Sequence, residues 1–145
     1  MKKSSVLLVC LFALSLTACA DKERPIEVNQ LPARAQQFLK ENFASAKVSY
    51  AKEESDWLDK NYEVLFANGD KIEFGKDGEW KEVDCRKSAV PDAVVPQAIR
   101  SHVAANHPDL KIVKIDRDKR GYDVKLGNGL ELKYDRDYRL TGYDD

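Results

Sequence analysis

The chain has 145 residues, with 24 Lys and Arg against 25 Asp and Glu and a formal net charge of −1. This length suits one domain with one modest core. The even balance of charges excludes the basic footprint of a nucleic-acid-binding protein and the polybasic patch that attracts anionic lipid, so we expect no nucleic-acid partner.

Residues 1–18 have the features of a bacterial lipoprotein signal peptide. Lys2 and Lys3 form a positive n-region, and the apolar run VLLVCLFALSL that follows is too short for a comfortable membrane span. The run ends in LTAC, residues 16–19, which resembles the lipobox, where a diacylglycerol is attached to the cysteine and the chain is cut before it. We predict lipid attachment at Cys19, and thus a membrane partner; the alternative is a secreted protein with a chance cysteine.

The residues after Cys19 bear on location. Ala20 stands where many inner-membrane lipoproteins carry a retaining aspartate. We therefore expect a lipid-anchored protein of the cell envelope at the outer membrane, on its periplasmic or surface side. Residues 19–30 are polar and non-periodic, which predicts a flexible tether with a root-mean-square span of roughly 20 Å.

Two segments have the periodicity of an amphipathic helix, and a proline opens the first turn of each. Each is followed by a short stretch of β-prone residues, KVSYA or KIVKI. The apolar stripe of the first is Leu31, Ala35, Phe38, Leu39 and Phe43, and that of the second is Val95, Ile99, His102, Val103 and His107.

Two similar hairpins follow these helices, and their register can be deduced. Asn68-Gly69 and Asn128-Gly129 are turn signals, and a three-residue loop ending at each glycine pairs apolar residues with apolar ones. In the second hairpin this register also pairs opposite charges, whereas in the first it places Glu63 opposite Glu73. The predicted pairs are Tyr62–Phe74, Val64–Ile72, Leu65–Lys71, Tyr122–Tyr134, Val124–Leu132, Lys125–Glu131 and Asp123–Lys133.

A second turn extends each hairpin. In the first half, Gly78 provides the left-handed residue of a turn that pairs Phe74 with Trp80 and Glu73 with Lys81. In the second half Tyr138 takes the place of Gly78, and a tyrosine is unfavourable in that conformation, so the geometry of this turn stays open.

The pattern predicts one α+β domain over residues 31–145, made of two repeats, 31–87 and 92–145. Each repeat would be a helix followed by about four antiparallel strands. Together they would form one sheet with both helices on one face, because duplication doubles a thin core and joining the units hides a sheet edge. Cys85 is the thiol that remains beyond Cys19, which favours a small buried side chain over a reactive or dimer-forming one.

The sequence resembles the PepSY-like family, also called β-lactamase-inhibitor-like. The resemblance lies in LPARAQQFLKENF, YEVLFANGDKIEFGKDGEW, VPQAIRSHVAANHPDLKIVKI and GYDVKLGNGLELKYD, which together cover nearly all of the chain after residue 30. It implies a small exported or lipid-anchored protein with a fold of helix-plus-sheet units and a suspected inhibitory role. Two departures from the pattern are the lack of disulfides and His107 before Pro108, where an aromatic residue is expected.

The histidines do not have the spacing of a metal site. His102 and His107 are five residues apart, which does not place two ligands on one helical face. They correspond to Phe38 and Phe43 in the first helix, and this favours packing at the edge of the core.

No other motif indicates catalysis. DRDKRG, residues 116–121, begins like a calcium loop, but Arg120 occupies a ligand position and Gly127 stands where the bidentate glutamate is required. There is no nucleophile elbow and no phosphate-binding loop. We predict no catalytic residues, no metal and no cofactor, and we do not expect an enzyme.

The candidate binding residues lie in the first repeat. Trp57, in the acidic insert EESDWLDKN, is a typical binding anchor if it is exposed; the insert could equally fold back so that Trp57 caps the core. Glu63 opposite Glu73, with Lys71 nearby, would favour a partner that presents Lys or Arg.

These features lead to two hypotheses of function. The first is a lipid-anchored cell-envelope module that binds an unknown protein partner, with inhibition of an envelope or secreted enzyme as one form of that binding. The alternative is a structural envelope lipoprotein with no dedicated ligand.

Overall fold

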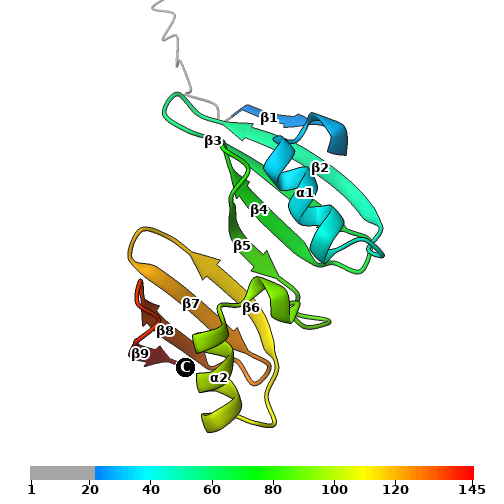
Figure 1. Ribbon diagram of the computed structural model, residues 1–145. Coiled ribbons are helices and arrows are strands. Elements are labelled where there is room, and N and C mark those ends of the chain that lie inside the picture. Colours follow the sequence, from blue (N-terminus) through cyan, green and yellow to red (C-terminus); the bar gives the residue numbers. More distant parts are fainter. Residues whose placement is uncertain (1–21) are drawn as a thin grey trace, which may run out of the picture.

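The computed structural model describes residues 22–145, so the predicted signal peptide and Cys19 lie outside the described residues. In this range nine strands form one antiparallel sheet, and each strand pairs with the next in chain order (Figure 1). The strands are β1 (Lys22–Pro25), β2 (Val48–Ser55), β3 (Lys60–Phe66), β4 (Lys71–Gly75), β5 (Trp80–Asp84), β6 (Ile112–Arg117), β7 (Gly121–Leu126), β8 (Glu131–Asp135) and β9 (Leu140–Asp144).

Two α-helices interrupt the strands within the described chain. They are α1 (Ala33–Asn42), between β1 and β2, and α2 (Gln97–Asn106), between β5 and β6. Each is preceded by a short 3-10 turn, η1 (Val28–Gln30) or η2 (Asp92–Val94). A proline directly precedes each helix, as the sequence predicted.

The predicted fold class is wrong. The described residues do not form a tandem repeat of helix-and-strand units with both helices on one face; they form a single continuous nine-stranded sheet with two helices. The strand β1 comes from the stretch expected to be a tether, and it pairs with β2, for example through Lys22 and Ser55. The pairing of β5 with β6 carries the sheet across the helical connection between them and joins all nine strands. The repeated sequence predicts hairpins, because a hairpin joins residues that are close in the chain. The pairings of β1 with β2 and of β5 with β6 instead join segments far apart in the chain.

The core lies between the sheet and the helices. Near α1, the Phe38 ring meets Phe74 edge-on at 5.7 Å, and Phe43 stacks on Phe66 at 5.3 Å. Near α2, Ile99 is fully buried in the same core cluster. Cys85 is also fully buried, and desolvation raises the pKa of its thiol to about 12, so it behaves as a small core residue.

The hairpin registers are confirmed with one exception. Tyr62 pairs with Phe74, and Tyr122 pairs with Tyr134, as the three-residue loops required. The predicted pairing of Glu73 with Lys81 is wrong, because a β-bulge between Glu73 and Phe74 places Glu82 opposite Glu73.

The turn that the sequence left open has the same geometry as its counterpart. Tyr138 has a φ of 63° and Gly78 a φ of 82°. In both turns the amide of this residue donates to the carbonyl three positions earlier, at 3.1 Å for Tyr138 and 2.9 Å for Gly78. Within residues 22–145 no helix is both long and apolar enough to cross a membrane.

Candidate functional site: the charged face of the sheet

Side chains of the central strands alternate between the buried core and a charged face, because successive residues of a strand point to opposite sides. On β3, for example, Val64 is fully buried while Glu63 is partly exposed. Many residues of this face form ion pairs. The charged residues of the face that matter here are Lys52, Glu63, Lys71, Glu73, Glu82, Lys114, Asp116, Asp123, Lys125, Glu131 and Lys133.

Five carboxylates stand directly opposite one another across five neighbouring strands. Glu63 on β3 faces Glu73 on β4, and Glu73 faces Glu82 on β5. Glu82 faces Asp116 on β6, and Asp116 faces Asp123 on β7. We call these residues the carboxylate row. Like charges directly opposite in a sheet destabilise it, so folding alone does not favour this arrangement.

Lysines border the row. Lys52 stands opposite Glu63 at one end, and Lys133 stands opposite Asp123 at the other. The Lys71 Nζ lies 2.9 Å from Glu73 Oε1, 3.1 Å from Glu82 Oε1 and 3.9 Å from Glu63 Oε2. Burial opposes the charged form of Lys71, but hydrogen bonds to Glu73 and Glu82 outweigh it and raise the pKa of the amine.

The centre of the row is the pair Glu82 and Asp116, where β5 meets β6. Burial and a hydrogen bond with Glu82 raise the pKa of Asp116 to about 6. Burial acts against ionisation of Glu82 as well, but hydrogen bonds from Asp116, Lys71 and Lys114 lower the pKa of Glu82. The Lys114 Nζ lies 3.2 Å from Glu82 Oε2 and 3.3 Å from Asp116 Oδ2. Asp116 is therefore the member of the pair that takes up a proton as the pH falls through about 6.

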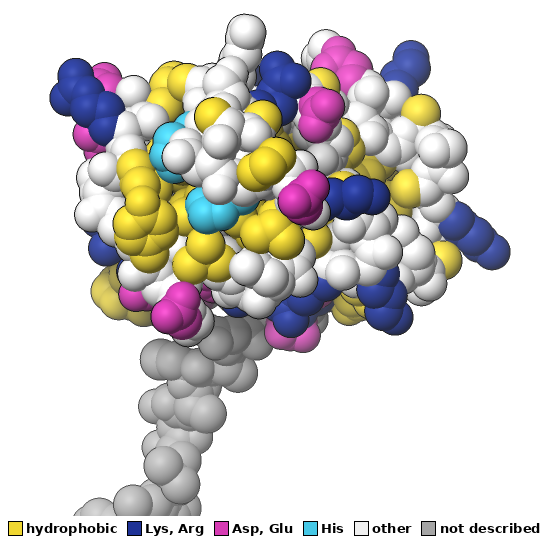
Figure 2. Space-filling view, turned by 90° about the horizontal axis from the view of Figure 1, so that it is seen from below, with side chains coloured by type: hydrophobic (Ala, Val, Ile, Leu, Met, Phe, Trp, Pro, Cys, Tyr) yellow, Lys and Arg dark blue, Asp and Glu magenta, His cyan; other side chains and the backbone are white. Residues whose placement is uncertain are grey.

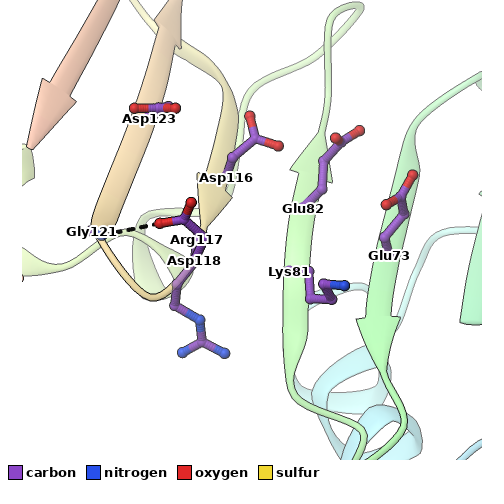
Figure 3. Close-up of a pocket in the computed structure, with 8 residues that line it drawn as sticks. All are labelled: Glu73, Lys81, Glu82, Asp116, Arg117, Asp118, Gly121 and Asp123. Atoms are coloured by element: carbon purple, nitrogen blue, oxygen red, sulfur yellow. Dashed lines mark hydrogen bonds between the residues drawn. The ribbon is translucent and has the colours of Figure 1, made fainter. Parts of the chain in front are cut away.

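Four members of the row, all except Glu63, line a hollow of about 280 Å³ (Figure 3). Figure 3 shows Glu73, Glu82 and Asp116 projecting from adjacent strands on the same side of the sheet, with Asp123 on the next strand. Among the ion pairs found in residues 22–145, none includes Asp123. Lys133, which stands opposite Asp123, pairs with Asp144, and Asp123 lines the hollow.

The basic residues of the hollow are held by other groups. The Lys81 Nζ donates to Asn61 Oδ1 at 3.0 Å. The Arg117 guanidinium donates to Glu79 Oε2 and to the Trp80 carbonyl, both at 2.8 Å, and lies 4.3 Å over the Trp80 ring. Both cations are therefore held by groups outside the carboxylate row.

Three of the four binding candidates from the sequence lie together on one surface. Glu63 and Glu73 face each other, and Lys71 lies between them. The sequence missed Glu82, Asp116 and Asp123. Their alignment depends on the bulge in β4, which the predicted register lacked, and on the pairing of β5 with β6, which joins segments far apart in the chain.

The fourth candidate, Trp57, lies apart from the row in the turn between β2 and β3. Its side chain is 84% exposed, and that of the adjacent Leu58 is 71% exposed. The alternative in which Trp57 folds back to cap the core is therefore wrong.

The two histidines occupy positions at the edge of the core, as the sequence favoured. Figure 2 shows them among hydrophobic side chains at the end of the molecule that carries α2. His102 Nδ1 lies 2.8 Å from the Tyr134 hydroxyl, and His107 lines a hollow of about 440 Å³ beside α2. Within the described range, no group of three His, Cys, Asp or Glu could hold a metal ion.

The architecture is that of a small α+β domain built on one antiparallel sheet. The chain belongs to the PepSY-like family: residues 60–141 match the family model described as "Putative beta-lactamase-inhibitor-like, PepSY-like". A search of curated proteins finds no match.

Solved structures from two bacteria are similar over most of the chain. A "putative calcium-regulated periplasmic protein" from Bacteroides thetaiotaomicron is 51% identical, with a TM-score of 0.83, over 85% of this chain and 97% of that one. A "putative periplasmic protein" from Bacteroides vulgatus is 55% identical, with a TM-score of 0.84, over 87% and 99%. A second B. vulgatus protein, described as periplasmic and of unknown function, is 36% identical, with a TM-score of 0.81, over 86% and 100%. These neighbours support a periplasmic, cell-envelope location.

Proposed function

We propose that this protein is a lipid-anchored binding module of the cell envelope, held at the outer membrane through Cys19, that binds a protein partner across the carboxylate row. The observation that carries the proposal is the row itself. Five carboxylates face one another across β3 to β7, and this costs folding free energy unless a cation lies over them. Lys71 and Lys114 supply part of that compensation from within the chain.

The partner's contribution is a Lys or Arg side chain. The hollow over the row is wide enough for one such side chain, and Asp123 is placed to receive its charge. An Arg would reach two neighbouring carboxylates at once through its planar fork. If the partner is an envelope or secreted enzyme and its bound Lys or Arg lies beside its active site, this binding would inhibit the enzyme.

A metal ion is a less suitable occupant. The neighbour from B. thetaiotaomicron is described as calcium-regulated. Within residues 22–145, however, no cluster has the ligands for a metal ion, and lysine amines already reach Glu73, Glu82 and Asp116. Neither the family description nor those of the neighbours names a catalytic activity.

Site-specific crosslinking in cells tests the proposal. A photoreactive amino acid at Asp123, inside the hollow, should give a defined protein adduct. The same group at Arg136, in the β8–β9 turn, should not. Absence of any adduct at Asp123 would favour the alternative of a structural lipoprotein without a dedicated ligand.

The identified partner then permits a quantitative test. Charge reversal of Glu73 together with Glu82 should weaken its binding by roughly 100-fold, since two charged contacts of about 1.4 kcal/mol each are lost. Reversal of Lys125, which contacts Glu131 outside the hollow, should leave binding within about twofold. Equal losses in both variants would mean that the row is not the contact surface.

The lipid anchor has a separate test. Cys19→Ser should move the protein from the membrane fraction to the soluble fraction and remove the diacylglycerol mass from its N-terminal peptide. A variant that stays in the membrane fraction would disprove attachment at Cys19.

A further inference from the structure

The turn between β2 and β3 presents two adjacent apolar side chains to solvent. Trp57 is 84% exposed and Leu58 is 71% exposed, which makes them the most exposed large hydrophobic residues in the described chain. Exposure of a tryptophan and a leucine side by side is unfavourable in water, and such pairs mark contact sites. Neither residue belongs to the carboxylate row.

The turn is held in a defined shape by its own acidic residues. Asp56 Oδ1 accepts hydrogen bonds from the amides of Leu58 at 2.8 Å and Asp59 at 2.6 Å. Asp59 Oδ1 accepts from the amide of Lys60 at 2.9 Å. Both carboxylates are thus engaged by the backbone of the turn, and the two apolar side chains form its apex.

The register of β1 places the start of the described chain beside this turn. Lys22 pairs with Ser55, the last residue of β2, whereas Pro25 pairs with Lys52 farther from the turn. Figure 1 shows the beginning of β1 next to the β2–β3 turn, at the end of the molecule remote from α2 and the C-terminus. Since Cys19 precedes Lys22 by three residues, at most about 11 Å of extended chain separates them.

We propose that the β2–β3 turn rests on the membrane to which Cys19 is anchored, with Trp57 and Leu58 in the interfacial layer of the bilayer. The inference rests on the proposed lipid at Cys19. A lipid there holds Lys22, and with it Ser55 and the turn, within a short distance of the headgroups. Tryptophan favours that layer because its ring is apolar while its N–H keeps a polar partner.

The contact fixes the orientation of the domain. A tether of residues 19–30 would let the body rotate freely, but pairing of β1 with β2 leaves only two residues between Cys19 and the sheet. The turn is a second attachment point close to the lipid, so it meets the membrane at a high effective concentration. One tryptophan and one leucine are then enough to keep the turn on the membrane. Glu63 lies three residues beyond Lys60, roughly 10 Å along β3 from the turn, so the carboxylate row stands above the headgroups.

Quenching of tryptophan fluorescence by lipid tests the inference. The acylated full-length mature protein is reconstituted in vesicles of phosphatidylethanolamine and phosphatidylglycerol, with or without lipids brominated near the headgroup end of the acyl chain. Emission should fall roughly twofold when brominated lipid is present, because a tryptophan in the interfacial layer is within reach of the bromines. Trp57→Phe, which retains Trp80 alone, should show no fall.

A matched control moves the probe to another exposed site. In the Trp57→Phe background, Tyr143→Trp places a tryptophan on β9, where the native side chain is 59% exposed. This probe should not be quenched. Quenching equal at residues 57 and 143, or at neither, would overturn the proposal. The proposal would also be overturned if the emission of Trp57 changed only when a protein partner was added. That result would assign the turn to protein binding.

An artificial anchor tests the membrane contact independently of the proposed lipid at Cys19. The mature chain from residue 19 is coupled through the Cys19 thiol to vesicles that carry a maleimide lipid; Cys85 is fully buried and does not compete. Quenching of Trp57 in this form supports the membrane contact even if mass analysis finds no diacylglycerol on the natural protein. Acylated protein without quenching would leave the lipid intact and disprove the contact.

Discussion

The strands β3, β4 and β5 and the strands β7, β8 and β9 have the same registers and the same turns but different surroundings. Gly78 and Tyr138 both adopt a left-handed conformation at the same point of the second turn. A Cβ at Gly78 would lie 2.9 Å from the Cβ atoms of Pro32 and Arg34, at the start of α1. Tyr138 instead packs on Tyr122, with ring centroids 5.5 Å apart. The comparison shows that the requirement for glycine comes from what lies over the turn, and only in part from the turn itself.

The beginnings of the two hairpins differ in a similar way. In the first hairpin Asn61 pairs with Gly75, and in the second Gly121 pairs with Asp135. The glycine of this pair is therefore on the later strand, β4, in the first hairpin and on the earlier strand, β7, in the second. A Cβ at Gly121, where φ is 153°, would lie 2.0 Å from the Tyr134 carbonyl oxygen. At Gly75 the nearest atom would be a flexible Asp77 carboxylate oxygen at 3.3 Å.

The largest expected effect is that of Gly121→Ala. The added methyl group cannot be accommodated without moving the β7–β8 backbone, so we expect a loss of about 4 kcal/mol in the free energy of unfolding. Gly75→Ala should cost less than about 1 kcal/mol, because a side-chain oxygen can move aside. Urea denaturation followed by circular dichroism measures both, and similar losses would show that the two positions are equivalent.

Gly78→Ala should come next, with a loss of about 2–3 kcal/mol. It combines left-handed strain with the close contacts to Pro32 and Arg34. Tyr138→Gly, its counterpart, relieves the same strain and loses only the Tyr122 contact, so stability should stay within about 1 kcal/mol of the native protein. A loss at Tyr138 as large as that at Gly78 would refute the role assigned to α1.

Replacement of a lysine on the charged face should lower stability more in the first half of the sheet than in the second. Lys71→Met removes the amine that lies within 4 Å of three carboxylates, and we expect a loss of about 1–2 kcal/mol at low salt. Lys125→Met removes a lysine with one ion-pair partner, Glu131, and should cost about 0.5 kcal/mol or less. Denaturation at low and high salt should show the larger salt dependence for Lys71.

The last expected effect is the pH dependence of stability at the junction of β5 and β6. The folded-state pKa of Asp116 is raised to about 6, so its contribution to stability is full below its unfolded value and is lost as pH rises through 6. The side chain is 38% exposed, and solvent screening reduces the change to about 1 kcal/mol. Asp116→Asn should remove this loss between pH 4 and pH 7.

A carboxylate of the second hairpin provides the control for this measurement. Glu131→Gln, which removes the partner of Lys125, should retain the loss of stability that Asp116 causes over the same pH range. A pH profile of Asp116→Asn that parallels that of the native protein would rule out Asp116 as the titrating group.

The sequence by itself determined the local structure. Alternation of apolar and charged residues and the positions of Asn68-Gly69 and Asn128-Gly129 were sufficient for both hairpin registers, because side-chain pairing and turn type act over a few residues. The prolines at the helix starts and the burial of Cys85 also followed from residue type. Glu63 opposite Glu73 was visible for the same reason.

Only the tertiary structure decided how these parts join. The pairing of β5 with β6 that aligns Asp116 and the pairing of β1 with β2 depend on contacts between segments far apart in the chain, whereas the bulge that brings Glu82 opposite Glu73 lies within one hairpin. Such contacts depend on how the whole sheet twists and closes its edges, and no short window of sequence contains that information. For this reason the carboxylate row and the position of the β2–β3 turn beside the start of β1 appeared only in the folded molecule.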